Sequence, residues 1–228
     1  MTGRRPRSSN PVVTSARIIP DGARGRRRAI EVLRGGGIVG IPTDTVYGIA
    51  VALSTPGGIE RLFEAKHRPL DKGIVLLLDD AGQAARIGRM TPAAAALAAA
   101  AWPGGLTIVV PQRPDVPWPP VLTGGVATIG LRVPDHAAPR ELARAVGPLP
   151  TTSANVSGMP ESADAAGILA ELGDAVELVL DGGPARGGPP STVVDCTGAE
   201  PFIARQGAMP AGDVAAILDR AGVRHALG

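Results

Sequence analysis

Residues 37–48 read Gly-Ile-Val-Gly-Ile-Pro-Thr-Asp-Thr-Val-Tyr-Gly, and this stretch decides the fold class. Its first part, residues 37–43, is a short apolar run rich in β-branched residues, which predicts a buried strand. Its second part brings Thr43, Asp44 and Thr45 to the end of that strand. Hydroxyl groups there can receive a small polar ligand such as an amino acid, or they can bond the local backbone in an Asx or ST turn. Taken alone, the stretch favours the turn.

Apolar runs of the same kind recur along the chain and alternate with helical patterns. Further strands are predicted at 73–80, 106–111, 126–134, 148–150, 176–183, 191–196 and 202–207. Helices are predicted at 21–34, 57–66, 91–101, 135–146, 161–172 and 210–221, the first capped by Asp21 and the third opened by Thr91-Pro92. Residues 118–125 are the best candidate for a mobile loop. The alternation predicts an α/β fold built on a twisted, mostly buried sheet.

The charge of the chain is unevenly distributed. Residues 1–34 hold nine arginines against two acidic residues, a net charge of +7, whereas the rest of the chain carries a net charge of −5. A basic arm attracts phosphate backbones without sequence preference. We therefore expect a flexible basic tail at 1–15, with nucleic acid as one partner that it could take, ahead of a single domain at 16–228.

The composition excludes several classes of protein. Aromatic residues make up 2% of the chain, too few to stack single-stranded bases, and one cysteine, Cys196, excludes a disulfide framework and a cysteine-based zinc cluster. No stretch approaches the ~20 apolar residues of a membrane span, and the N-terminus lacks the apolar segment of a secretory signal. A Walker loop, a dinucleotide-binding fingerprint, a zinc-protease motif and a nucleophile elbow are also missing. We expect a cytoplasmic protein that does not contact a membrane.

The two lysines of the chain lie six positions apart, at the ends of Lys66-His67-Arg68-Pro69-Leu70-Asp71-Lys72. The other 21 basic residues are arginines, so a compact ammonium occurs only here. Lysine acts on phosphate as a point charge, whereas arginine recognises it through a planar fork. Three cations this close repel one another, and a polyanion would compensate them. The segment therefore predicts a nucleotide polyphosphate as ligand, with chance placement of the lysines as the alternative.

Two further segments combine hydroxyl groups with strand ends. Residues 151–158, Thr-Thr-Ser-Ala-Asn-Val-Ser-Gly, follow a short strand and offer hydroxyls and a carboxamide in a tight turn, or a cap for the next helix. Ser191 and Thr192 open one strand, Arg205 lies in the next, and Arg132 lies near the end of another. Because polar residues at strand ends tend to converge, we expect these residues to share one site.

Taken together, these segments resemble the YrdC-type threonylcarbamoyl-AMP synthase family in its single-domain form. The matching motifs are collinear and read PTDTVYG (42–48), KHRP (66–69), WPGGLTIVV (102–110), IGLRVPDH (129–136), TSANVSG (152–158), STVVD (191–195) and ARQGA (204–208). They cover about residues 28–210. The resemblance implies a single α/β domain in which a twisted mixed sheet is flanked by helices and carries an open concave site.

For the activity, the resemblance implies an L-threonylcarbamoyladenylate synthase, which is a nucleotidyltransferase. Such an enzyme makes threonylcarbamoyl-AMP and pyrophosphate from L-threonine, bicarbonate and ATP, the first step toward N6-threonylcarbamoyladenosine in tRNA. Mg²⁺ would enter with ATP and need few protein ligands, and no redox cofactor and no separate metal site are expected. The further partners would be tRNA and the threonylcarbamoyl-transferase proteins that take the product onward.

The resemblance also implies a role for individual residues. The catalytic positions would be Lys66, Arg68, Ser153 and Asn155. The ATP side would consist of these four residues with Lys72, Thr128 and Arg205. The threonine side would consist of Thr43, Thr45, Arg132, Thr151 and Ser191, with Arg132 as the partner of the carboxylate. Leu77 stands in a strand where many relatives carry a histidine, so one threonine contact is left open.

Two other functions remain open at this point. A non-catalytic module could bind tRNA or double-stranded RNA on a basic concave surface, although the acidic body of the chain argues against a basic stripe. A related carbamoyl-adenylate transferase, as in hydrogenase maturation, would use the same adenylate chemistry. Proteins of that kind carry additional zinc and acylphosphatase-like modules, for which this chain has neither the length nor the cysteines.

Overall fold

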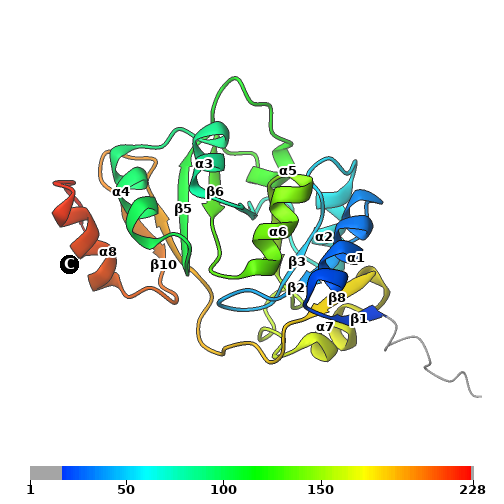
Figure 1. Ribbon diagram of the computed structural model, residues 1–228. Helices are drawn as coiled ribbons and strands as arrows, with labels where there is room; N and C mark the ends of the chain where they lie inside the picture. The colour runs from blue at the N-terminus through cyan, green and yellow to red at the C-terminus, as the bar shows by residue number, and fades with distance from the viewer. Residues whose placement is uncertain (1–16, 227–228) are drawn as a thin grey trace, which may run out of the picture.

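The computed structural model describes residues 17–226, so the tail predicted at 1–15 lies outside the described residues. Within this range the strands form one ten-stranded sheet in the order β1-β8-β2-β3-β7-β4-β6-β5-β9-β10 (Figure 1). The strands are β1 (Ile18–Pro20), β2 (Val39–Ile41), β3 (Gly48–Ala50), β4 (Val75–Leu77), β5 (Leu106–Pro111), β6 (Thr128–Arg132), β7 (Leu149–Ser153), β8 (Leu178–Asp181), β9 (Thr192–Asp195) and β10 (Phe202–Arg205).

The sheet is mixed and is flanked by helices, as the resemblance implies. Neighbouring strands run parallel in β1–β8–β2, β4–β6 and β5–β9, and antiparallel at the other junctions. The helices are α1 (Ala23–Arg34), α2 (Gly58–Ala65), α3 (Ala81–Ile87), α4 (Pro92–Ala101), α5 (Pro120–Thr123), α6 (Ala137–Val146), α7 (Ala165–Leu172) and α8 (Ala211–Arg220), with a short 3₁₀ turn at Gly173–Ala175. The predicted fold class is therefore confirmed.

One face of the sheet is covered by helices along most of its width. Strand residues such as Ile49, Leu76 and Leu131 alternate onto this face and are fully buried. They share one hydrophobic cluster with residues from the helices α2, α3, α4, α7 and α8. This cluster is the main core of the protein, and burial of its apolar surface is the largest stabilising contribution to the fold.

The opposite face is covered at one end only. There α1 and α6 lie side by side over β8, β2, β3, β7 and β4, with Leu33 and Leu142 fully buried against the sheet (Figure 1). Among the described residues, no member of this second cluster comes from β6, β5, β9 or β10. At the matching positions these strands carry small or polar side chains, including Thr107, Thr128 and Gly130. The second face is therefore open over half of the sheet.

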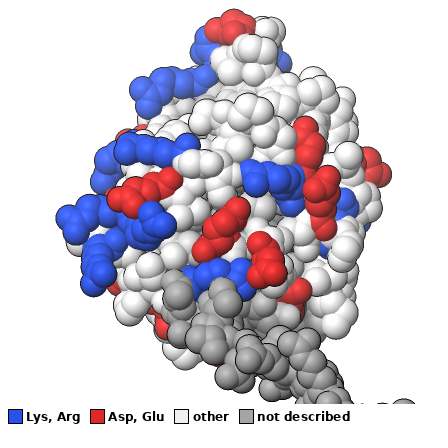
Figure 2. Space-filling view, turned by 90° about the vertical axis from the view of Figure 1, so that its right-hand side faces the viewer, with Lys and Arg blue, Asp and Glu red and all other residues white. Residues whose placement is uncertain are grey.

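The surface around α1 carries charges of both signs (Figure 2). Arg26 pairs with Asp21 at 2.6 Å and with Glu141 of α6 at 3.1 Å, and Arg28 pairs with Glu31 at 2.8 Å. Asp21 was predicted to cap this helix, and that prediction was wrong. Gly22 occupies the N-cap position without a side-chain bond, because the carboxylate of Asp21 is held by the Arg26 guanidinium.

Two other segments differ from their sequence-based predictions. Residues 118–125, predicted as a mobile loop, contain the single-turn helix α5, whose Leu122 is fully buried and accepts a hydrogen bond from the Ile74 amide at 3.0 Å. The helix predicted from residue 161 begins at Ala165, because the Asp164 side chain accepts a hydrogen bond from Gly167 N and caps it there. The helix start predicted at Thr91-Pro92 is confirmed, since the Thr91 side chain caps α4 and Pro92 is its first residue.

Candidate active site

The open part of the sheet face holds a cavity of about 380 Å³. Three alternate residues of β6, namely Thr128, Gly130 and Arg132, line its floor, because alternate side chains of a strand point to the same face. Val75 of β4 lies beside Gly130, and Thr151 of β7 lies beside Val75 on its other side. The site residues therefore extend across the face of the sheet and do not lie only at strand ends.

Nine of the twelve predicted site residues line this cavity. They are Thr43, Thr45, Arg68, Thr128, Arg132, Thr151, Ser153, Ser191 and Arg205. Lys66 and Asn155 are buried behind the wall that Ser153 forms, and Lys72 is exposed outside the cavity. The structure thus brings most of the predicted residues together but places both lysines outside the lining.

Arg132 defines one end of the cavity, and its guanidinium is held from three sides. Nη2 donates to Asp44 Oδ1 at 2.7 Å, Nη1 donates to Thr45 Oγ1 at 3.0 Å, and Nε donates to Gly104 O at 3.0 Å. The Arg132 side chain is 6% exposed and the Asp44 side chain 7%, so the ion pair is buried. Burial lowers the pKa of Arg132, and the carboxylate of Asp44 opposes that shift. This arrangement fixes the orientation of a cation at the cavity wall.

The two threonines of the PTDTVYG motif have different roles in the structure. Thr43 Oγ1 donates to Val46 O at 2.6 Å and accepts from Thr45 N at 3.1 Å, which is the local turn that the sequence left open. Thr45 is buried and its hydroxyl accepts from Arg132. Thr45 therefore belongs to the Arg132 end of the cavity, whereas Thr43 holds the turn that presents it.

Ser191 joins this end to the outer strand β10. Its hydroxyl lies 2.8 Å from Thr107 Oγ1, and its carbonyl accepts from Arg205 Nη2 at 2.8 Å. Gly207 is required at the adjacent turn, since a Cβ there would lie 2.2 Å from Pro190 O. The strand β10 is an edge strand and largely exposed. The hydrogen bond to Ser191 nevertheless keeps the Arg205 side chain at the cavity.

Leu77 also lines the cavity, and the register pairs it with Arg132 across β4 and β6. Its side chain is almost fully buried. Leu77, where many relatives carry a histidine, therefore forms an apolar part of the cavity wall next to Arg132.

Lys66 lies at the other end, with all three donors of its ammonium satisfied by the protein. Nζ donates to Ser153 O at 2.5 Å, to Asn155 Oδ1 at 3.0 Å and to Asn155 O. Burial, together with the charge of Arg68, lowers the pKa of Lys66 to about 8. The lysine thus fixes the turn after β7 from behind.

The Ser-Ala-Asn turn is held by a connected set of hydrogen bonds. Ser153 Oγ donates to Asn155 Oδ1 at 2.6 Å, and Asn155 Nδ2 donates to Met159 O at 2.5 Å. On the other side, Ser162 Oγ donates to Ala154 O at 2.7 Å. Ser153 is the member of this set that reaches the cavity.

Arg68 lines the cavity at the Lys66 end and keeps unused hydrogen-bonding capacity. Nη2 donates to Gly73 O at 2.9 Å, and the guanidinium carbon lies 5.5 Å from the centroid of the Phe63 ring. The Nε atom is buried without a partner among the described residues. Because a buried unpaired donor is costly, a ligand oxygen that accepted from this atom would be stabilised there.

Sequence reasoning missed three residues of the site. Asp44 was read as part of a turn, Thr107 as a member of an apolar strand, and Glu161 was assigned no role; Thr107 and Glu161 line the cavity, and Asp44 holds Arg132. The alternation of residues 106–111 could have placed Thr107 opposite the core, but no local signal marks the other two.

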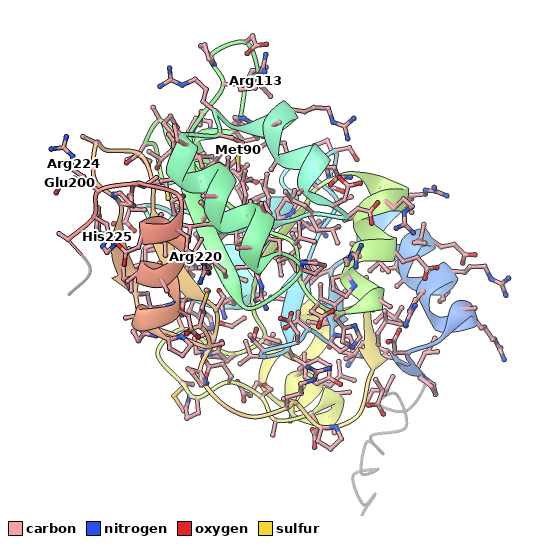
Figure 3. All side chains as sticks on the ribbon, turned by 60° about the vertical axis from the view of Figure 1, so that its left-hand side comes forward. Met90, Arg113, Glu200, Arg220, Arg224 and His225 are labelled. Carbon is pink, nitrogen blue, oxygen red and sulfur yellow. The ribbon has the colours of Figure 1, made fainter. Side chains whose placement is uncertain are left out.

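In the part of the chain that the structure describes, the remaining chemistry-bearing groups do not form a second centre. A more open hollow beside α8 is lined by acidic and basic residues, namely Glu200, Asp219, Arg224 and His225. Glu200, Arg224 and His225 lie at the outer end of the molecule (Figure 3). Within residues 17–226 no group of three or more His, Cys, Asp or Glu side chains could hold a metal ion. Burial raises the pKa of Cys196 to about 12, so its thiol is not a nucleophile at neutral pH.

The fold and the cavity define a class of protein. It is a mixed-sheet α/β protein whose open sheet face holds hydroxyls, one oriented arginine and two further arginines, a surface suited to a small carboxylic acid beside a polyphosphate. The helices of the described residues include none long and apolar enough to cross a membrane.

Comparison with known proteins identifies the family within this class. The profile of the Sua5/YciO/YrdC family, described as "Telomere recombination", matches residues 31–207. A putative threonylcarbamoyl-AMP synthase of Mycobacterium tuberculosis is 36% identical over 86% of this chain and 90% of its own length. The chain therefore belongs to the Sua5/YciO/YrdC family, and the predicted family is confirmed.

Solved structures agree with this assignment. Sua5 of Pyrococcus abyssi complexed with L-threonine has a TM-score of 0.80 and 32% identity, covering 88% of this chain and 58% of that one. YciO of E. coli has a TM-score of 0.76 and 28% identity, covering 85% of this chain and 95% of that one. The match to the Pyrococcus protein thus concerns little more than half of that longer chain.

Proposed function

We propose that this protein is an L-threonylcarbamoyladenylate synthase. The threonine amine and bicarbonate form an N-carboxylate with loss of water. That carboxylate attacks the α-phosphorus of ATP, the bond between the α-phosphorus and the bridging oxygen breaks, and pyrophosphate leaves with the electron pair. The products are threonylcarbamoyl-AMP and pyrophosphate. Relatives that are named for this reaction, and one crystallised with L-threonine, support the proposal.

The observation that carries the proposal is the arrangement of cations along one cavity. Arg132, oriented by Asp44, can pair with the carboxylate of threonine at one end. Arg68 at the other end, together with Arg205, whose charge acts on both Arg68 and Arg132, can neutralise the triphosphate. Phosphoryl and nucleotidyl transfer depend mainly on positioning and charge neutralisation, so the absence of an activated protein nucleophile among the lining residues is consistent with this chemistry.

The remaining site residues follow from the same arrangement. Ser153 and Thr128 would contact the nucleotide from the floor, while Thr45, Thr151 and Ser191 would surround the amino acid. Lys66 would act through the turn that it holds, with Asn155, because its three donors are engaged by Ser153 and Asn155. Lys72 would contribute to the field around the entrance.

We further propose that ATP enters with Mg²⁺, and that the product is passed to a transferase that modifies tRNA, which places the protein in the cytoplasm. The face around α1 gives little support to a purely RNA-binding role. It carries acidic as well as basic residues (Figure 2), and Arg26 and Arg28 are already paired. A phosphate backbone would have to displace those carboxylates.

A pyrophosphate assay tests the proposal. The purified chain is incubated with ATP, Mg²⁺ and bicarbonate, with and without L-threonine, and pyrophosphate release is measured. We expect release that requires both threonine and bicarbonate, and the matched control is L-serine in place of threonine. Release that ignores threonine would refute the synthase, and tRNA binding without any release would favour the RNA-binding alternative.

A further inference from the structure

Glu161 is the one carboxylate among the described residues that line the cavity. It follows the Ser-Ala-Asn turn and precedes α7, and its side chain is exposed toward the cavity. Within residues 17–226 it makes no hydrogen bond and no ion pair through its carboxylate. An unpaired acid therefore stands in a wall whose other charged members are Arg68, Arg132 and Arg205.

The cations around Glu161 are near enough to sense its charge. Burial lowers the pKa of Lys66 and the pKa of Arg205, and the charge of the Glu161 carboxylate partly opposes both shifts. Arg205 donates to Ser191 and Arg68 donates to Gly73, so neither guanidinium turns to Glu161. Glu161, Arg68 and Arg205 thus line the same cavity without forming an ion pair across it.

The position of Glu161 is fixed by its neighbour in the chain. Ser162 is buried, and its hydroxyl lies 2.7 Å from Ala154 O and 3.1 Å from Glu171 Oε1. Glu171 also accepts from Val156 N at 3.3 Å. The backbone before α7 is therefore tied to the Ser-Ala-Asn turn, which holds Glu161 in the cavity wall.

A carboxylate at this place conflicts with a bare triphosphate. Two unit charges of the same sign a few ångströms apart repel, and the repulsion is stronger near a protein surface than in bulk water. The repulsion becomes an attraction when a divalent cation lies between them. Mg²⁺ is typically held by one or two carboxylates together with phosphate oxygens and water, so a single acid is a sufficient protein contribution.

We propose that Glu161 is the protein ligand, directly or through one coordinated water, of the Mg²⁺ that enters with ATP. This inference rests on the proposed function, since it needs a polyphosphate at the Arg68 end of the cavity. The ion would supply neutralisation of the charge that develops on the departing pyrophosphate. Glu161 itself orients the metal-bound triphosphate so that Arg68 and Arg205 remain free for the other phosphate oxygens.

The test measures ATP binding by the full chain with and without metal. ATP is titrated into wild type and Glu161→Gln by calorimetry, once in excess EDTA and once in excess Mg²⁺, with threonine absent so that no turnover occurs. Without metal the variant should bind ATP more tightly, because a repelling charge is gone. With Mg²⁺ it should bind at least about tenfold more weakly, since loss of a metal-positioning group typically costs that much.

The matched control is Asp71→Asn. The charge of Asp71 also acts on Arg68, but Asp71 does not line the cavity. Its removal should change ATP affinity in the same direction and by a similar factor in both titrations. A second readout is the binding of Mn²⁺ to the protein–ATP complex, followed by electron paramagnetic resonance, which should weaken in Glu161→Gln and not in Asp71→Asn.

The outcomes separate this inference from the proposed function. If Glu161→Gln changes ATP affinity by the same factor with and without Mg²⁺, Glu161 is only a charge at the entrance and the inference is wrong. If wild type binds no ATP under either condition, the synthase itself is refuted. A change of sign between the two titrations, found in Glu161→Gln alone, supports the metal ligand.

Discussion

At one end of the cavity Arg132 is paired with Asp44 inside the protein, whereas Arg68 at the other end faces the cavity without an ion-pair partner among the described residues. Arg205 also lacks such a partner there, and its charge acts on both Arg68 and Arg132. The first end is electrically balanced before any ligand arrives. The second holds excess positive charge and a buried Nε of Arg68 with no acceptor. Under the proposed function, the Arg132 end would take the single carboxylate of threonine, and the polyphosphate would neutralise the Arg68 end.

The largest effect is expected from a substitution that removes the buried ion pair between Arg132 and Asp44. Asp44→Ala leaves the Arg132 guanidinium buried and unpaired, and removal of one partner from a buried ion pair typically costs about 3–5 kcal/mol. We expect the free energy of unfolding, measured by urea denaturation, to fall by about that amount. Threonine-dependent pyrophosphate release should also be lost, because Arg132 is no longer oriented.

The exposed pair Arg113–Asp115 is the control for this experiment. Its N–O distance of 2.7 Å equals that of the buried pair, but its side chains are 41% and 61% exposed. Solvent screens such a pair, so Asp115→Ala should leave the urea midpoint unchanged within error. Equal losses in both variants would mean that distance, and not burial, decides the effect, and the contrast between the two ends would lose its basis.

A second prediction separates the two ends by ligand. Arg68→Met should weaken ATP binding by roughly 10- to 100-fold, which corresponds to the loss of charge-assisted hydrogen bonds, and leave threonine binding unchanged. Arg132→Lys keeps the charge but not the fork geometry, so it should weaken threonine binding and spare ATP. Calorimetric titration of each ligand into each variant measures all four values. Loss of both ligands in both variants would show that the cavity is a single undivided site.

Part of this arrangement can be read from the sequence by physical reasoning. The alternation in Thr-Ile-Gly-Leu-Arg at 128–132 separates two buried apolar residues from three that face the cavity, and Thr91-Pro92 marks the start of a helix. The resemblance carried by the collinear motifs implies that Ser153, Asn155 and Arg205 belong to one site, and Ser153 and Arg205 line the same cavity. These features depend on a few adjacent residues, so they survive without knowledge of the fold.

Other features depend on contacts between distant segments. Asp44 and Arg132 are 88 positions apart, and only the sheet order brings them together. Lys66 was expected to face the triphosphate, but its C-cap position at the end of α2 turns it inward to Ser153 and Asn155. Both the pairing of Asp44 with Arg132 and the direction of the Lys66 side chain depend on how distant segments pack. The sequence around each residue does not contain that information.

The smallest effect concerns the two lysines, which behave as different groups in the structure. Lys66 is buried with a pKa of about 8, so its ammonium persists at neutral pH and is lost as the pH rises through that value. The neutral amine has fewer donors for Ser153 and Asn155, and the turn that presents Ser153 should loosen. We expect ATP affinity to decrease a few-fold between about pH 7 and pH 9 in the wild type.

Lys72→Met tests whether this pH dependence belongs to Lys66. Lys72 is exposed and outside the cavity lining, so its loss should lower ATP affinity slightly at every pH and keep the same decrease above about pH 8. Calorimetric titrations of ATP across that range provide the measurement. A flat profile in Lys72→Met would assign the titrating group to the exposed lysine. The Arg68 end would then depend on charge at the entrance, and not on a buried ammonium that holds its turn in place.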